Sequence, residues 1–452
     1  MWLFGRKKMK DLQDAAAGGE QPKQEAAQDY WSIVKRQFKK NRLAVWSLRF
    51  FYVILFVAIF ADFLANEKPL YCRIDGKTYF PVIQQYFVDL GFSSWDEKLQ
   101  MKRWSDHQYE SVLFPPITYS PTTIDKKNLS YTSPLVTQKL APRMSHHWLG
   151  TDALGRDVAA GMIHGTRTAM LVGVVSMSIA TLIGIILGAF AGYFGDDRMK
   201  VSRIRIWLNL LALFLAFFYA FIVRGYSMAD GINKSGLFVE LGKTFGLIAL
   251  IFAAANLLVI PLKKIAFLGK KVTVSVDLLI MRFIEVVNSV PVLILILCIV
   301  AIIKNPSLVY VMIIIGAVSW TGIATFIRAE LLRVRRLEYI EAAQAFGYSE
   351  WRTIIYHAIP NSLTSVLITI AFGIASAILT ESFLSFIGVG VPAEQVTWGS
   401  LLSESRDKFQ AWWLAVFPGI AIFATVTIFN LIGEGLSDAL DPRSRSEERR
   451  VG

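Results

Sequence analysis

Charge and cysteine are both scarce in this sequence. Only 18% of its 452 residues are Asp, Glu, Lys or Arg, whereas 54% are hydrophobic, and the mean hydropathy is +0.46. The two cysteines, Cys72 and Cys298, are too few for a disulfide framework and lack metal-ligand spacing, so we interpret both as packing residues. The composition therefore excludes an ordinary soluble domain and a small disulfide-stabilised secreted protein.

A cleavable signal peptide is also missing. The N-terminus reads MWLFGRKKMKD and has no apolar core followed by a small-residue cleavage site. Residues 11–29 are rich in Ala, Gln, Glu and Gly, a composition that favours a disordered tail. We therefore expect the tail to stay on the chain.

Long apolar runs dominate what is present. About 20 apolar residues span the hydrocarbon of a bilayer as a helix, and helices pair every backbone polar group internally. The sequence therefore predicts an all-α, polytopic membrane protein with eight spans. The predicted spans are residues 44–64, 168–192, 205–223, 245–262, 276–302, 309–327, 364–388 and 412–436.

The net charge of +12 is explained by topology. With the N-terminus inside, the predicted cytoplasmic segments hold 27 Lys and Arg residues, and the short external loops hold six. This bias orients membrane helices, so both termini are predicted to be cytoplasmic and nucleic acid is not an expected partner. A basic amphipathic helix over 31–46 would contact anionic membrane lipids through Lys35, Arg36, Lys39 and Lys40.

The end of the predicted external region is rich in His and Asp. It reads HHWLGTDALGRDVAAGMIHGTRTAM, in which Thr151 or Asp152 is predicted to cap a short helix and Gly150 and Gly155 to form turns. Adjacent histidines fit one helix face poorly and no HExxH pattern is present, so no metal site is expected. A membrane metalloenzyme remains an alternative, with ligands from His146, His147, Asp152, Asp157 and His164.

One stretch resembles a nucleotide-binding loop. GLFVELGKT ends in Gly242-Lys243-Thr244, but five residues separate Gly236 from Gly242, where a P-loop has four. We therefore expect this chain to bind no nucleotide and no other cofactor.

Polar residues inside the predicted spans are candidates for a translocation path, because ionisable groups are costly in hydrocarbon. Arg282 lies three residues before Glu285 and can pair with it, and Pro291 is predicted to bend its helix. Positions satisfied locally at the membrane interface are the alternative. The candidates are Glu285, Asn288, Ser289, Pro291 and Glu381.

Small residues also recur within one span. Gly184, Gly188 and Gly192 follow one another at four-residue steps. Such a row lets a neighbouring helix approach closely, which favours tight helix packing in lipid.

A polar stretch interrupts the apolar runs at residues 337–362, LEYIEAAQAFGYSEWRTIIYHAIPNS. A short helix is predicted to end at Gly347 in the left-handed conformation. Ser349 can cap a second helix to His357, and Pro360 is predicted to break the chain before the next span. The stretch is either a plug for a groove on another protein or a solvated connector.

The segments EAAQAFG and HAIP resemble the E-A-A-x3-G…I-x-L-P loop of bacterial ABC importer permeases. Ile359 stands for the Leu of that loop, and His357 for its usual Ile. The matching residues are Glu341, Ala342, Ala343, Gly347 and Pro360.

Further segments resemble the C-type permeases of dipeptide and oligopeptide transporters. They are NRLAVWSL, NSVP, ESFLSFIGVGVP…WGSLL, DALDPR and GTDALGRDV, the last containing Gly150, Thr151, Asp152, Gly155, Arg156 and Asp157. The external segments ANEKPLYCRIDGKTYFPV and LFPPITYS most closely resemble the microcin C/oligopeptide branch.

The resemblance implies a type I ABC importer permease fold, with a six-helix core and an inserted two-helix hairpin. The expected segments are a cytoplasmic tail with the interfacial helix (1–43), the first span (44–64), the periplasmic region (65–167), the second span (168–196), the inserted hairpin (197–272), the core (273–436) with its coupling loop (328–362), and the C-terminal tail (437–452).

The resemblance also implies a function. The chain would be a non-enzymatic, inner-membrane permease that imports peptides together with a homologous second permease. Two ABC ATPases would bind ATP and receive the coupling loops, and an extracytoplasmic solute-binding protein would deliver cargo. A nickel chelate or a peptide antibiotic is the alternative cargo. In a passive channel, a third possibility, the coupling loop would have no purpose.

Overall fold

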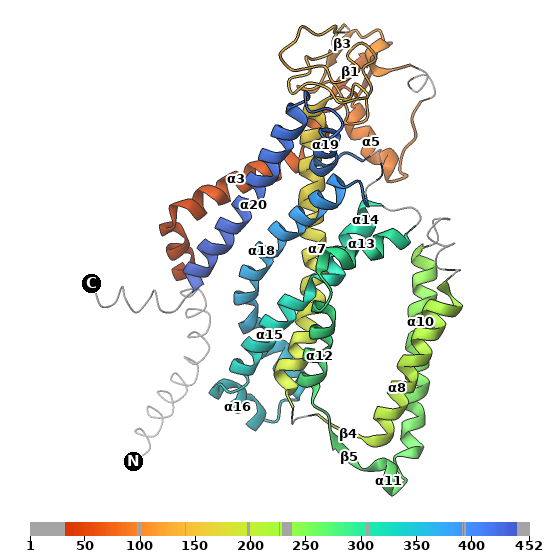
Figure 1. Cartoon of the computed structure of the whole chain (residues 1–452), viewed down its shortest axis with the longest axis vertical. Helices are drawn as coiled ribbons and strands as arrows, with labels where there is room; N and C mark the ends of the chain where they lie inside the picture. The colour runs from red at the N-terminus through yellow and green to blue at the C-terminus, as the bar shows by residue number, and fades with distance from the viewer. Residues whose placement is uncertain are drawn as a thin grey trace, which may run out of the picture. The chain divides into compact units, whose positions relative to one another are not determined.

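Long helices dominate the computed structural model (Figure 1). Seven of the described helices are long and apolar enough to cross a membrane, or eight if the bent pair α12 (Val276–Asn288) and α13 (Val292–Ile302) forms one span. The prediction of eight spans is confirmed when the bent pair is counted as one span. The structure describes residues 32–440 except 97–98, 100–101, 141, 197–198, 226, 228–236, 304–306, 391 and 393–394, so both predicted tails lie largely outside the described residues.

The other spans each overlap one of the predicted apolar runs. They are α3 (Arg42–Ile59), α7 (Val158–Phe194), α8 (Arg203–Phe217), α10 (Leu237–Leu262), α14 (Leu308–Val318) followed by α15 (Trp320–Val334), α18 (Ile359–Phe386) and α20 (Trp413–Leu440).

Helix α7 begins at Val158, earlier than the predicted residue 168. The Asp157 carboxylate accepts the backbone N–H of Ala160 at 2.7 Å, which is the geometry of a helix N-cap. The expected cap at Thr151 or Asp152 is therefore wrong. The predicted start at residue 168 was the first residue of the apolar run. The helix begins ten residues earlier, directly after its cap at Asp157.

The structure consists of two compact units. The first contains residues 32–186, 287–327 and 351–440 as far as these are described. In this unit α18 packs along α20, and α20 along α3, as Figure 1 shows. The short helix α19 (Trp398–Glu404) packs against α18 and α20, with Trp398 buried beside Ile378.

Close backbone approach holds the helices of this unit together. A Cβ atom at Gly184 would lie 2.7 Å from Cβ of Ile323, and one at Gly316 would lie 2.6 Å from the carbonyl oxygen of Ser176. Both distances are below van der Waals contact, so these positions admit only glycine at this spacing. Small residues have this role in membranes, because lipid removes the hydrophobic drive for helices to associate.

The segment between α3 and α7 folds into a small region of its own. Its sheet has the order β2-β1-β3, and both pairs of neighbouring strands are antiparallel. Short helices precede the sheet and lie between its strands in the sequence. Cys72 of β1 is buried with Leu99 and Trp104, as a packing residue should be. The elements are α4 (Ala61–Leu64), β1 (Tyr71–Ile74), β2 (Lys77–Tyr79), α5 (Pro81–Asp89), a 3-10 turn (Trp104–Asp106) and β3 (Ser111–Leu113).

The other cysteine differs from the prediction. Cys298 is exposed on α13 and so does not pack in the interior. A free thiol behaves as a small hydrophobic group, so the sequence alone does not distinguish the exposed Cys298 from the buried Cys72.

A buried ionic triad fastens this region to the start of α7. His147 is fully buried, with Nδ1 2.7 Å from Asp157 and Nε2 3.2 Å from Asp125. Its ring stacks on Tyr119 with centroids 4.3 Å apart. Both ring nitrogens face carboxylates, so both must carry protons for both contacts to be hydrogen bonds. Although burial lowers the pKa of His147, the two carboxylates outweigh it and raise that pKa above its ordinary value.

The second unit contains the two-helix hairpin that the sequence analysis predicted as an insertion. It comprises residues 187–286 and 328–350 as far as these are described. Strand β4 (Lys200–Ser202) pairs antiparallel with β5 (Lys271–Thr273), with Val201 opposite Val272. The chain therefore leaves and returns at one ribbon, and between the two strands run α8, a π-helical turn (Phe218–Val223), α10 and the short α11 (Ala266–Gly269).

Polar contacts stabilise this unit at two places. Asn256 of α10 donates to Asn209 of α8 at 3.2 Å and accepts from Arg205 at 3.0 Å. Near the ribbon, Arg328 of α15 makes a bidentate contact with Asp277 of α12, in which Nη2 lies 2.6 Å from Oδ2. Such a fork holds two helices in a fixed orientation.

Gly184→Ala tests the close approach in the first unit. The added methyl group collides with Ile323, so we expect a loss of about 1–3 kcal/mol in stability. Gly322→Ala is the matched control, because a Cβ atom there meets nothing within 4 Å and Ala favours helix by up to about 1 kcal/mol. Thermal unfolding of the purified protein in detergent measures both, and equal midpoints would contradict the packing argument.

The His147 triad predicts a pH dependence of stability. The folded state binds the His147 proton more tightly than the unfolded chain, so its contribution is complete below the ordinary pKa of 6.5 and is lost as the pH rises through the raised value. We expect the unfolding midpoint to fall by several degrees between about pH 6 and about pH 9.

Two variants isolate this effect. Asp125→Asn removes the longer of the two carboxylate contacts and leaves the Asp157 cap intact, so the fall should be smaller. His147→Gln should remove this part of the pH dependence. An unchanged fall in Asp125→Asn would show that the triad does not titrate with folding.

Candidate functional site

The polar stretch forms a short helix, α16 (Glu338–Ala345). Ile340 is 0% exposed and Ala343 is buried, whereas Glu341 and Ala342 are exposed. One face of α16 is therefore packed, and the face with Glu341 and Ala342 is open to a partner or to solvent.

A left-handed glycine ends this helix. Gly347 has φ +79°, as predicted, and the N–H of Tyr348 donates to the carbonyl of Ala343 at 3.2 Å. This six-to-one hydrogen bond is the Schellman arrangement, which satisfies a carbonyl at the helix end. A Cβ atom at Gly347 would meet nothing within 4 Å, so the backbone conformation, and not crowding, favours glycine.

Exposed aromatic side chains lie at both ends of α16, Tyr339 in its first turn and Phe346 and Tyr348 beside Gly347. Phe346 is 82% exposed, and Tyr339 and Tyr348 are each 40% exposed. Exposed aromatic groups beside charged residues are typical of protein interfaces. We call these three side chains, with Glu341 and Ala342, the α16 surface.

Pro360 does not break the chain as predicted. Helix α17 (Glu350–Thr353) continues through a π-helical turn (Ile354–Ala358) directly into α18, with Pro360 in the first turn of α18. Proline has no N–H and tolerates the first turn of a helix. The widened π turn before it accommodates the chain, so the break predicted from proline alone is wrong.

The GTDALGRD motif forms a compact joint. Gly150 and Gly155 have φ +79° and +80°, which confirms the predicted turns. Asp152 Oδ1 accepts the backbone N–H groups of Leu154 at 2.9 Å and Arg156 at 2.8 Å. Thr151 accepts the N–H of Thr132 at 2.9 Å, and its carbonyl accepts the Trp413 indole at 3.0 Å. The motif therefore ties α20 to the loop before α7.

Arg156 extends this joint to α19. It contacts Asp152 on one side and Glu404 Oε1 at 2.7 Å on the other. The second oxygen of Glu404 is buried and has no hydrogen-bond partner among the described residues. Burial and the Asp152 carboxylate raise the pKa of Glu404 to about 7, although Arg156 opposes this. No sequence pattern predicts this pair, because 248 positions separate Arg156 from Glu404.

Among the described residues, no three or more His, Cys, Asp or Glu side chains are grouped so that they could hold a metal ion. His147 is engaged by Asp125 and Asp157, and His164 contacts the carbonyl of Ala65 at 2.8 Å. His146 lies beside the Trp148 ring. The histidines therefore do not converge on one point, which removes the geometric basis for the metalloenzyme alternative.

The P-loop-like residues lie inside a helix. Gly242, Lys243 and Thr244 belong to α10, and Thr244 donates to the carbonyl of Glu240 at 2.8 Å. The preceding Gly236 lies outside the described residues. Helical N–H groups are occupied along the helix and cannot cradle phosphates.

The candidate path residues lie in different environments. Glu285 is exposed and pairs with Arg282 at 2.7 Å, which confirms that they can pair on one helix face. Asn288, Ser289 and Pro291 are exposed where α12 and α13 meet, and the two helices are bent there by 77°. The bend agrees with the prediction for Pro291.

Glu381 lies apart from these residues in character. It is 1% exposed in α18 and accepts a hydrogen bond from Ser385 at 2.6 Å. Burial with a local hydroxyl partner favours the locally satisfied alternative for this carboxylate.

The sequence analysis missed the aromatic part of the α16 surface, although aromatic residues in a polar loop were a usable signal.

Known proteins resemble the chain over most of its length. Residues 265–446 match the family described as binding-protein-dependent transport system inner membrane component, and residues 29–81 match the N-terminal TM domain of oligopeptide transport permease C.

Three relatives illustrate the similarity. The inner membrane ABC transporter permease protein YejE of Escherichia coli (strain K12) is 29% identical, over 90% of this chain and 95% of its own length. The dipeptide transport system permease protein DppC of Bacillus subtilis (strain 168) is 26% identical, over 69% and 73%.

The oligopeptide transport system permease protein OppC of Haemophilus influenzae is 30% identical, over 68% of this chain and 73% of its own. The family match at residues 265–446 contains the α16 loop. The chain belongs to the family of inner-membrane permease components of binding-protein-dependent transport systems.

Proposed function

We propose that the chain is a permease subunit of an ABC importer that moves peptides across the inner membrane. The observation that carries the proposal is the α16 surface, a short helix ended by a left-handed glycine with exposed aromatic side chains beside it. Relatives named as dipeptide and oligopeptide permeases support the choice of cargo.

The proposed orientation has both termini in the cytoplasm. The excess of Lys and Arg in the segments that this orientation puts inside supports it. The α16 surface then lies in the cytoplasm, and the region between α3 and α7 lies outside. Basic side chains between residues 31 and 46 would contact lipid headgroups.

The α16 surface would dock into a groove on a separate ATPase. A helix with a packed face and an exposed face fits this mode of recognition. Ala342 allows close approach of a partner, and Glu341 offers a carboxylate beside it. The Gly347 turn fixes where the helix ends, so ATP-driven movement of the partner would be passed to the spans as movement of a rigid element.

The remaining partners follow from this arrangement. A homologous second permease would complete the path, two ATPases would bind and hydrolyse ATP, and an extracytoplasmic binding protein would deliver the peptide. This chain would break no covalent bond and bind no cofactor. Polar residues at the bend between α12 and α13, namely Asn288, Ser289 and Pro291, would line part of the path with Glu285. Glu381, which is buried and bonded to Ser385, would stabilise α18 and would not line the path.

Gly347→Asp tests the coupling role. Aspartate strains a left-handed position by about 1 kcal/mol and adds a negative charge at a helix C-terminus, which the helix dipole disfavours. We expect loss of peptide uptake with normal insertion in the membrane. Gly347→Asn is the matched control, because Asn has the same shape, tolerates this conformation and carries no charge. Wild-type uptake by Gly347→Asp would contradict the coupling role.

Phe346→Ser tests the docking surface directly. Phe346 is 82% exposed, so the change should not affect folding. Loss of an aromatic anchor costs about 2 kcal/mol or more at an interface, so the amount of ATPase that co-purifies should fall by at least about tenfold. Phe409→Ser, at a side chain 90% exposed elsewhere, should leave co-purification unchanged. Equal losses in the two variants would disprove the specific surface.

A further inference from the structure

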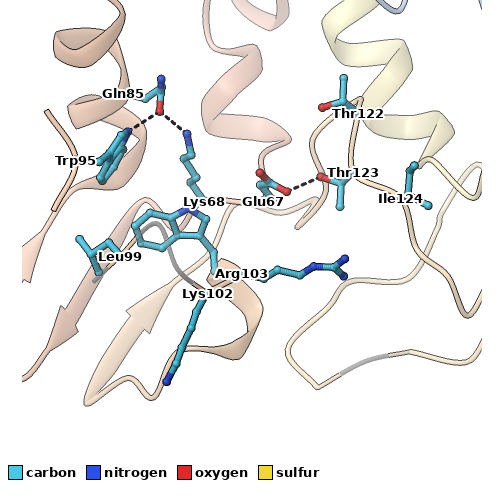
Figure 2. A pocket seen from close by; sticks show the side chains of 11 residues that line it. Glu67, Lys68, Gln85, Trp95, Leu99, Lys102, Arg103, Thr122, Thr123 and Ile124 are labelled. Carbon is cyan, nitrogen blue, oxygen red and sulfur yellow. Dashed lines mark hydrogen bonds between the residues drawn. The ribbon is translucent and has the colours of Figure 1, made fainter. Parts of the chain in front are cut away.

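A cleft opens in the small region between α3 and α7, separate from the α16 surface. It has a volume of about 690 Å³ and is walled by the loop after α4, by α5 and by the segment that leads to β3 (Figure 2). Pockets of roughly 300–1,000 Å³ hold small ligands. No residue assigned above to coupling or to the translocation path lines it.

The cleft carries an excess of positive charge. Lys68, Lys102 and Arg103 line it, and Glu67 is its single carboxylate. Glu67 accepts a hydrogen bond from Thr123 at 2.8 Å, as the dashed line in Figure 2 shows. None of the three cations forms a salt bridge with another described residue. An anion would therefore be the complementary ligand.

One of these cations is held in place inside the cleft. Lys68 donates to Oε1 of Gln85, which also accepts the Trp95 indole N–H at 3.0 Å (Figure 2). Its ammonium lies 5.3 Å from the centroid of the Trp95 ring. An ammonium has three donors, so Lys68 can bind an anion without releasing Gln85. Burial lowers the pKa of Lys68 even though Glu67, Asp89 and Asp62 oppose it, and a bound carboxylate would offset this cost.

Arg103 supplies a second donor group at the opening. It is exposed, and in Figure 2 its side chain reaches across toward the side of Thr123 and Ile124. A guanidinium presents a planar fork of donors that matches the two oxygens of a carboxylate. Lys102 points away from the other labelled side chains in the same view, so Arg103 is the better test of anion binding.

The floor of the cleft is apolar and aromatic. Leu99 and Trp104 are buried, and the Trp95 and Trp104 rings pack edge to face with centroids 5.5 Å apart. Rings in this arrangement offer a flat apolar surface to a ligand. The cleft therefore combines cations at its rim with an apolar floor, and the ligand should have a carboxylate attached to an apolar group.

We propose that this cleft binds the carboxyl-terminal end of a short peptide, with the carboxylate at Arg103 and an apolar last side chain toward the apolar floor of the cleft. The identification of the ligand as a peptide, and the outward position of the cleft, rest on the proposed function. The amino-terminal end of a peptide carries an ammonium, which the three cations would repel. The cleft thus selects one end of the peptide.

Direct binding tests this inference on the purified full-length chain in lipid nanodiscs, without ATPases. The probes are Ala-Ala-Phe and its carboxyl-terminal amide, titrated by calorimetry. We expect the acid to bind at least about tenfold more tightly than the amide, because a charge-assisted hydrogen bond contributes about 1.5–3 kcal/mol. Arg103→Gln should lose that preference, and Arg103→Lys should keep part of it.

Lys77→Gln is the matched control. Lys77 is an exposed cation of β2 in the same region and does not line the cleft, so its removal should change the affinity less than about twofold. The proposal is overturned if the wild-type protein binds neither probe, if it binds both equally, or if the two variants lose affinity equally.

The experiment separates this inference from the proposed function. Failure of peptide binding would leave the co-purification of ATPases with the α16 surface unaffected. If no ATPase co-purifies with the wild-type chain but the acid still binds more tightly than the amide, the cleft remains a carboxylate site and the importer proposal fails.

Discussion

Close backbone contact between helices is the constraint on which the rest of this structure depends. In hydrocarbon, burying an apolar side chain gains little, so association requires surfaces that fit closely. Gly184 against Ile323, Gly316 against Ser176 and Gly433 against the Phe372 ring provide such fits in the first unit. These contacts hold the helices from whose ends the polar segments extend, and larger side chains there would move those ends.

The β4–β5 ribbon closes the hairpin of α8 and α10 at its base. The strands begin at Lys200 and end at Thr273, and their pairing brings the two ends of the inserted hairpin together. An insertion that returns to its starting point adds an even number of crossings, so the orientation of every later span is unchanged. The polar contacts between α8 and α10 then stabilise the hairpin within itself, through Asn209 and Asn256.

The two surfaces discussed here have different physical characters. The α16 surface is a small rigid element whose aromatic side chains are exposed, which suits force transmission between proteins. The cleft has an aromatic floor, and its cations form no salt bridge with the residues that the structure describes, which suits a small charged ligand. The joint at Arg156, between Asp152 and Glu404, lies with the cleft in the first unit and connects helices far apart in sequence. The proposed sites of recognition and of coupling therefore lie in separate parts of the chain.

The sequence by itself determined the features that depend on neighbouring residues. Apolar runs predicted the spans, charge bias predicted an orientation, and one glycine predicted the left-handed turn at Gly347. Only the tertiary structure decided which distant groups meet, such as Arg156 with Glu404 and His147 with Asp125. It also decided that a π-helical turn precedes α18, so that the helix continues past Pro360 without a break. The physical reason is that helix formation and insertion depend on local spacing, whereas ion pairs and clefts depend on packing between segments that no local pattern relates.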